Sequence, residues 1–120
     1  MTILADHVRL DVTGEWTPGK EVEEIKNTLG AVADACRENG LERMLAVFDM
    51  GGRIPIGVAY EVAKDPASVG WERHFKGALV HRDEERYESN LFTETVAVNR
   101  SFNFKAFNDE GAALKWLLAP

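Results

Sequence analysis

The sequence predicts an α/β fold with a four- to five-stranded mixed β-sheet and about four α-helices. Two short apolar runs, 44–48 and 77–80, each lead into a segment of helical character. A third run, 102–107, alternates apolar and polar residues and leads into a helix that ends at Leu117. Strands that alternate with helices in this way are typical of a sheet covered by helices. The length of 120 residues suits one domain, residues 1–120.

The first third of the chain predicts two strands and a long helix. Apolar and polar residues alternate over residues 8–13, which indicates a strand with one buried face. We expect residues 3–5 to form a short partner strand, with Asp6 and His7 in the turn. Thr17 and Pro18 are typical of a helix N-cap and first turn. That helix should end at Asn39 and Gly40.

The central third predicts two further strands and a helix. Residues 44–48 are all apolar, which favours a central strand covered on both faces. Residues 54–64 have helical character, and Asp65-Pro66 interrupts them, with Asp65 placed to cap a short helix. The next strand spans residues 76–81.

The last third predicts a helix, a strand and a final helix. Asp83 can cap a helix over residues 84–98. Helical spacing gives that helix an apolar face, which we expect to carry Tyr87, Leu91, Thr95 and Val98, widened by Phe92 and Val96. The strand 102–107 follows, and Asn108-Asp109 should cap the final helix.

Composition narrows the classes of function. The formal net charge of −6 gives a field that repels nucleic acid, so we expect no nucleic-acid partner. The single cysteine, Cys36, allows no intramolecular disulfide and suits a small core residue. The N-terminus lacks the pattern of a signal peptide, and no run reaches the length of a membrane span, so we expect a cytoplasmic protein. His7, His74 and His81 lack metal-ligand spacing, and we expect neither a metal nor a cofactor.

Three segments carry a resemblance to a known family: Val12-Thr-Gly-Glu-Trp-Thr17, Lys76-Gly-Ala-Leu-Val-His81, and Phe104-Lys-Ala-Phe107 followed by Ala112-Ala-Leu-Lys-Trp-Leu117. With the order of elements, they make the chain resemble the SpoIIAA-like family, whose fold is related to the STAS domain of bacterial anti-sigma-factor antagonists. The resemblance implies a mixed sheet with mobile helices over an apolar cavity. Through the related CRAL-TRIO lipid-transfer fold, it makes a hydrophobic ligand conceivable.

The chain departs from the STAS antagonists at one functional position. Antagonists that act as phospho-switches carry an Asp-Ser pair after the central strand, whereas no Ser or Thr occurs between Phe48 and Ala67. A phosphate switch needs a hydroxyl there. The resemblance therefore implies no phospho-switch, and it brings no catalytic residues.

A loop after the central strand is the first candidate for a ligand site. Asp49, Gly51, Gly52 and Arg53 follow the carboxyl end of that strand, where open α/β sheets commonly bind ligands. Backbone amides of the two glycines can approach an anion, and Arg53 adds positive charge. A tight turn that needs glycine explains the same residues. His81 ends the next strand and is a second candidate, either as a pocket residue or as an ordinary strand end.

Aromatic and apolar residues give a second group of candidates. Tyr60, Tyr87 and Leu91 lie on the helices near 55–64 and 84–98, and our hypothesis places an apolar pocket between these helices. Trp71 and Phe75 follow an irregular segment and are candidates for a contact face. Core packing explains most of these aromatic side chains equally well.

Three functional hypotheses follow. The first is a non-catalytic domain that binds a protein partner or a small apolar ligand. The second is a regulatory, homodimeric interaction module without a ligand. The third is a small hydrolytic or proton-transfer enzyme that uses Asp49, His81 and Arg53, although the chain has no recognisable catalytic set.

Overall fold

The computed structural model describes residues 1–50 and 54–120. In chain order its elements are β1 (Thr2–Ile3), β2 (Val8–Gly14), α1 (Glu21–Glu38), β3 (Arg43–Met50), α2 (Ile56–Ala63), the 3-10 helix η1 (Pro66–Val69), β4 (Lys76–His81), α3 (Glu84–Val98), β5 (Asn103–Phe107) and α4 (Glu110–Leu118). The predicted α/β class, with a mixed sheet and four α-helices, is confirmed.

The five strands form one sheet in the order β1-β2-β3-β4-β5. β1 pairs antiparallel with β2, and the other neighbours pair in parallel. In this register Gly14 lies opposite Met50, and Phe48 lies opposite His81. The carboxyl ends of β2, β3 and β4 therefore meet at one edge of the sheet.

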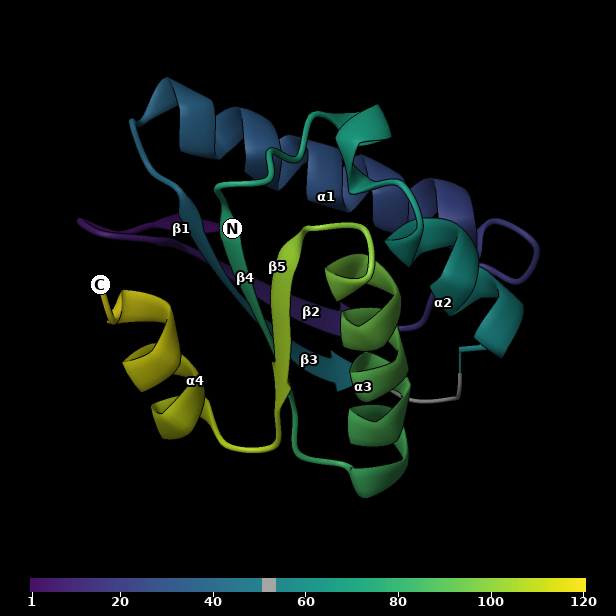
Figure 1. The fold of residues 1–120 in the computed structure, drawn as a ribbon. Helices are drawn as coiled ribbons and strands as arrows, with labels where there is room; N and C mark the ends of the chain where they lie inside the picture. The colour runs from purple at the N-terminus through teal and green to yellow at the C-terminus, as the bar shows by residue number, and fades with distance from the viewer. Residues whose placement is uncertain (51–53) are drawn as a thin grey trace.

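Helices cover the two faces of the sheet unequally. α1, α2 and α3 lie on one face and α4 lies on the other (Figure 1). The larger core packs under the three helices and includes Val8, Val32, Cys36, Met44, Trp71, Phe75 and Phe104. The smaller core packs under α4 and consists of Leu45, Ala78, Val80, Ala113 and Leu117. Because successive strand residues point to opposite faces, β3 and β4 contribute to both cores.

Trp71 and Phe75 belong to the larger core, which corrects the expectation that they form a contact face. Their side chains are only 1% and 2% exposed. Gly70 adopts φ +89°, a left-handed conformation that ends η1 and turns the chain back toward the sheet. Trp71 then stacks on Phe104, with 5.1 Å between the ring centroids. The irregular segment before Trp71, which suggested loose packing, therefore directs these two rings into the core.

α1 begins later than predicted, and η1 begins as predicted but without its expected side-chain cap. α1 begins at Glu21, and its N-cap Lys20 makes no side-chain capping bond. Thr17 and Pro18 instead belong to the preceding turn, closed by a hydrogen bond from Lys20 N–H to the Thr17 carbonyl. η1 begins at Pro66, as expected, but the side chain of its N-cap residue Asp65 makes no capping hydrogen bond. Turn-forming Pro18-Gly19, with Gly19 at φ +82°, delays the helix by one turn.

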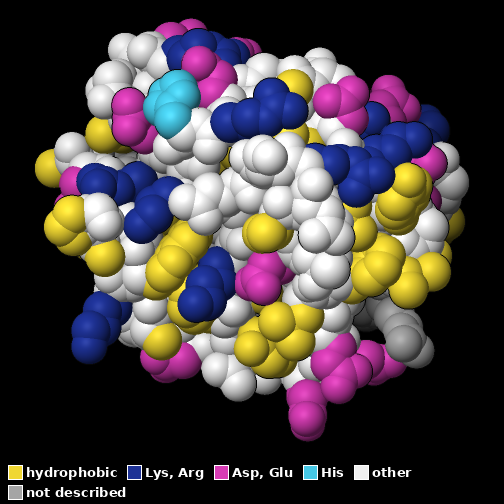
Figure 2. Space-filling model, viewed as in Figure 1, with side chains coloured by type: hydrophobic (Ala, Val, Ile, Leu, Met, Phe, Trp, Pro, Cys, Tyr) yellow, Lys and Arg dark blue, Asp and Glu magenta, His cyan; other side chains and the backbone are white. Residues whose placement is uncertain are grey.

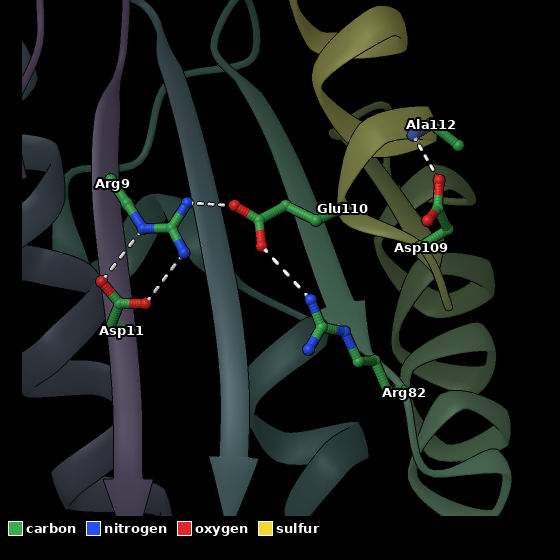
Figure 3. Close-up of polar contacts among 6 residues, drawn as sticks. All are labelled: Arg9, Asp11, Arg82, Asp109, Glu110 and Ala112. Carbon is green, nitrogen blue, oxygen red and sulfur yellow. Dashed lines mark hydrogen bonds and ion pairs between the residues drawn. The ribbon is translucent and has the colours of Figure 1, made fainter.

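The two C-terminal helices begin as predicted. The Asp83 carboxylate accepts a hydrogen bond from Arg86 N–H at the start of α3. The Asp109 carboxylate accepts one from Ala112 N–H at 2.8 Å at the start of α4 (Figure 3). Each carboxylate satisfies a backbone donor that the helix cannot pair, and each lies at the positive end of the helix dipole.

Candidate ligand-binding cavity

A cavity of about 110 Å³ lies between the sheet and the helices α1, α2 and α3. The sheet contributes mainly apolar side chains to its wall: Leu10, Val12, Met44, Ala46, Phe48, Leu79 and Phe104. The helical layer adds further apolar side chains: Ile25, Leu29, Ala59, Val62, Ala63, Pro66 and Ala97. The predicted pocket between the helices near 55–64 and 84–98 is therefore present, and α1 and the sheet complete it.

The position of the cavity follows from the alternation of side chains along the strands. On β2, Leu10 and Val12 point toward the three helices, while Arg9 and Asp11 point to the other face. On β3, Ala46 and Phe48 also point toward the three helices. The cavity thus reaches the carboxyl ends of the parallel strands, which is where open α/β sheets commonly bind ligands.

α3 turns a different face to the cavity from the one that its apolar residues predict. The lining residues Arg86, Asn90, Thr93 and Ala97 follow one another at helical spacing, with Glu85 and Ser89 beside them. On the expected face, Thr95 and Val98 are exposed whereas Val96 is buried, and none of these residues lines the cavity. An inward face rich in polar side chains is unusual for a helix over a sheet. Such local conflicts with the hydrophobic pattern concentrate at functional sites.

Two polar atoms in the cavity wall have no hydrogen-bond partner among residues 1–50 and 54–120. They are Nε1 of Trp16 and Nδ2 of Asn90, and both atoms are buried. Trp16 lies just beyond β2, after Gly14 at φ +87°, and Asn90 lies on the inward face of α3. A buried donor without a partner costs about 1–3 kcal/mol. The fold therefore keeps two costly groups in the wall of one cavity.

His81 is the candidate residue from the sequence that lines the cavity. It is 5% exposed, and its ring stacks on Phe48 with 5.5 Å between the ring centroids. Burial lowers the pKa of His81, and the positive charge of Arg86 lowers it further. Its imidazole is therefore neutral at pH 7 and offers one donor and one acceptor. Arg86, which is 8% exposed, was missed at the sequence level.

The other predicted ligand residues that the structure describes do not line this cavity. Gly51, Gly52 and Arg53 lie outside the described residues. Asp49 directly follows the inward-facing Phe48, so its side chain points to the opposite face of the sheet. Tyr60, Tyr87 and Leu91 do not line the cavity. Tyr60 is 40% exposed and contacts Arg100 instead.

These positions bear on the hypothetical catalytic set of Asp49, His81 and Arg53. Asp49 and His81 belong to neighbouring strands, but their side chains project from opposite faces of the sheet. General acid–base catalysis requires both groups within hydrogen-bond reach of one substrate. Asp49 nevertheless acts on His81 electrostatically, because its charge raises the pKa of His81 against the larger opposing effect of burial. The catalytic set therefore stays a hypothesis.

A charged cluster on the opposite face has a structural role. Arg9 on β2 donates to Asp11 at 3.1 Å and also to Glu110 on α4, and Arg82 approaches Glu110 at 3.7 Å (Figure 3). The hydrogen bond to Glu110, with that to Asp11, raises the pKa of Arg9 well above its ordinary value. Each of these charges has a partner of opposite sign. The cluster joins α4 to β2, and its charges are already satisfied within the protein.

The surface beside the cavity mixes apolar and charged groups. Ile56 and Tyr60, one helical turn apart on α2, are 70% and 40% exposed. Lys64 and Arg100 each lie 5.7 Å from the Tyr60 ring centroid. On the face drawn in Figure 2, basic and acidic side chains are interspersed. That face is not the broad basic surface typical of a nucleic-acid-binding protein.

Comparisons with models of protein families, with curated proteins and with solved structures found no match to this chain. The SpoIIAA-like resemblance therefore stays a prediction from its motifs. Within residues 1–50 and 54–120, no group of three or more His, Cys, Asp or Glu side chains is placed to hold a metal ion. In the same part of the chain, no helix combines the length and apolar character needed to cross a membrane.

Proposed function

We propose that this protein is a non-catalytic binding domain that takes a small, mainly apolar ligand into the cavity under α1, α2 and α3. The observation that carries the proposal is the apolar cavity itself, placed at the carboxyl ends of the parallel strands. Well-packed interiors contain few voids larger than a water molecule. A void of about 110 Å³ leaves the surrounding side chains without packing partners, and an apolar ligand would supply them.

The polar inward face of α3 supports the same proposal. Ligand pockets are mostly apolar, with a small number of polar groups that fix the orientation of the ligand. Arg86, Asn90 and Thr93 would supply such groups to an otherwise apolar wall. A domain selected for stability alone would gain from apolar residues at these positions.

The first test is native mass spectrometry of the freshly purified protein, with a denaturing run of the same sample. We expect an extra mass that leaves on denaturation and identifies the ligand class. The variant Ala59→Leu places a larger side chain in the cavity wall and should lose that mass. Ala112→Leu makes the same change on the exposed side of α4 and should keep it.

A bare chain mass, together with no increase in thermal midpoint from any small apolar compound, would count against a ligand cavity. Bound ligand at a hundredfold excess over its Kd should stabilise the protein by about 2.7 kcal/mol. The spectrum would also test the homodimer, which remains a prediction.

A further inference from the structure

The chemistry of the cavity wall indicates which polar group the ligand carries; this inference rests on the proposed function. Trp16 and Asn90 line the same cavity, and their buried atoms Nε1 and Nδ2 have no hydrogen-bond partner in the described part of the chain. An indole N–H can only donate a hydrogen bond, and an amide nitrogen also donates. Both unsatisfied atoms therefore require the same complement, a hydrogen-bond acceptor.

Three ionisable side chains also line the cavity: His81, Glu85 and Arg86. Arg86 is 8% exposed and has a guanidinium group that donates but cannot accept. Glu85 adds a carboxylate of opposite charge to the same wall. The inference of an acceptor group therefore rests on the two buried donors and not on the net charge of the wall.

The cavity volume limits the size of the ligand. An engineered apolar cavity of about 150 Å³ binds benzene. The cavity here, at about 110 Å³, is of the same order. The apolar body of the ligand is therefore about one aromatic ring or a short branched chain, with a polar group that reaches Trp16 or Asn90 in the wall.

We propose that the cavity selects compact, ring-sized apolar compounds bearing a carbonyl or carboxylate oxygen that accepts hydrogen bonds from Trp16 Nε1 and Asn90 Nδ2. The oxygen supplies what both buried donors lack, and the ring contacts the apolar side chains of the sheet. Selectivity then comes from the donors, because an apolar wall alone discriminates poorly between compounds of equal size.

Four probes of nearly equal size and shape test this selectivity on the wild-type protein. Cumene has no polar group, acetophenone has a neutral acceptor, benzoate has an anionic acceptor, and benzamidinium has donors only. Dissociation constants come from two-dimensional amide NMR titrations at fixed salt and pH 7. Satisfying a buried donor corresponds to about tenfold in affinity. We expect acetophenone or benzoate, or both, to bind at least tenfold more tightly than cumene, and benzamidinium to bind most weakly.

Two variants locate the preference at the named atoms. Trp16→Phe removes the N–H and keeps an aromatic ring, and Asn90→Leu replaces the amide with an apolar group of similar size. Each should reduce the advantage of the acceptor probes over cumene several-fold, measured as the ratio of the dissociation constants within the same variant. The matched controls are Trp116→Phe on α4 and Asn27→Leu on the exposed side of α1, which should keep the full preference. Circular dichroism checks that every variant is folded.

The outcomes separate the two proposals. If cumene binds as well as acetophenone and benzoate, the acceptor inference is overturned while the apolar cavity stands, and ordered water satisfies the donors. Preference for benzamidinium would overturn it as well. If no probe binds and no mass is found in the native spectrum, the proposed function itself fails.

Discussion

We predict that Gly77→Ala, which adds a single methyl group, destabilises the protein. Gly77 lies in β4 under the larger core, directly opposite Phe104 of β5. A Cβ atom at this position would lie 2.6 Å from both Cδ1 and Cε1 of the Phe104 ring, and 3.4 Å from the terminal methyl of Met44. Carbon atoms in contact prefer about 3.5–4.0 Å. Roughly 1 Å of overlap must therefore be relieved.

The ring of Phe104 has little room to move away. Trp71 stacks against it with 5.1 Å between the centroids, and Trp71 is itself fully buried. Overpacking of this kind costs about 1–3 kcal/mol. Replacing a strand glycine with alanine otherwise gains about 0.5–1 kcal/mol from backbone entropy. The net loss for Gly77→Ala should be about 1–2 kcal/mol, which corresponds to a thermal midpoint lower by about 4–8 °C for a chain of this length.

Gly57→Ala on α2 is the matched control. Nothing lies within 4 Å of the added Cβ, so the same substitution should raise stability by about 0.5–1 kcal/mol. Both variants are measured by urea unfolding and by thermal circular dichroism. Stability of Gly77→Ala equal to or above wild type would refute the reasoning. In a Phe104→Leu background the same change should cost less, because the clashing ring atoms are gone.

Two further predictions concern single polar side chains. Because burial lowers the pKa of His81 in the folded protein, the unfolded chain binds a proton first as the pH falls below about 6.5, and stability should fall with it. His81→Phe keeps an aromatic ring against Phe48 and should lose less stability in urea between pH 7.5 and pH 5; parallel losses in both proteins would contradict this. The Glu94 carboxylate accepts a 2.7 Å hydrogen bond from Ala106 N–H on the edge strand β5, so Glu94→Ala should cost about 1.5–3 kcal/mol and increase concentration-dependent self-association. Glu94→Gln keeps an acceptor and should retain most of the stability, measured by urea unfolding, and most of the resistance to self-association, measured by gel filtration. If Glu94→Ala is as stable and as monodisperse as the wild type, Glu94 does not protect the edge strand.

Local patterns in the sequence were sufficient to predict the order of the strands and helices. The all-apolar run 44–48 gave a central strand, and the alternation around residue 10 gave a strand with one buried face. Asp83 and Asp109 marked two helix starts correctly, because a capping carboxylate acts on backbone donors only three residues away. The physical causes of these features lie within a few residues of one another.

The cavity and its wall depended on partners far apart in the chain. α3 offers two stripes at helical spacing, and the stripe with Arg86 and Asn90 faces inward, although the other stripe is more apolar. Packing against β5 and α2 decided the orientation of the helix, and no pattern within α3 records those neighbours.

The burial of Trp71 also depends on a distant partner, because its ring stacks on Phe104, which lies more than thirty residues later in the chain. The sequence by itself therefore determined the elements and their order, since these depend on local backbone and side-chain preferences. Tertiary structure alone decided which side chains share the cavity, since that depends on how the helices rest on the sheet.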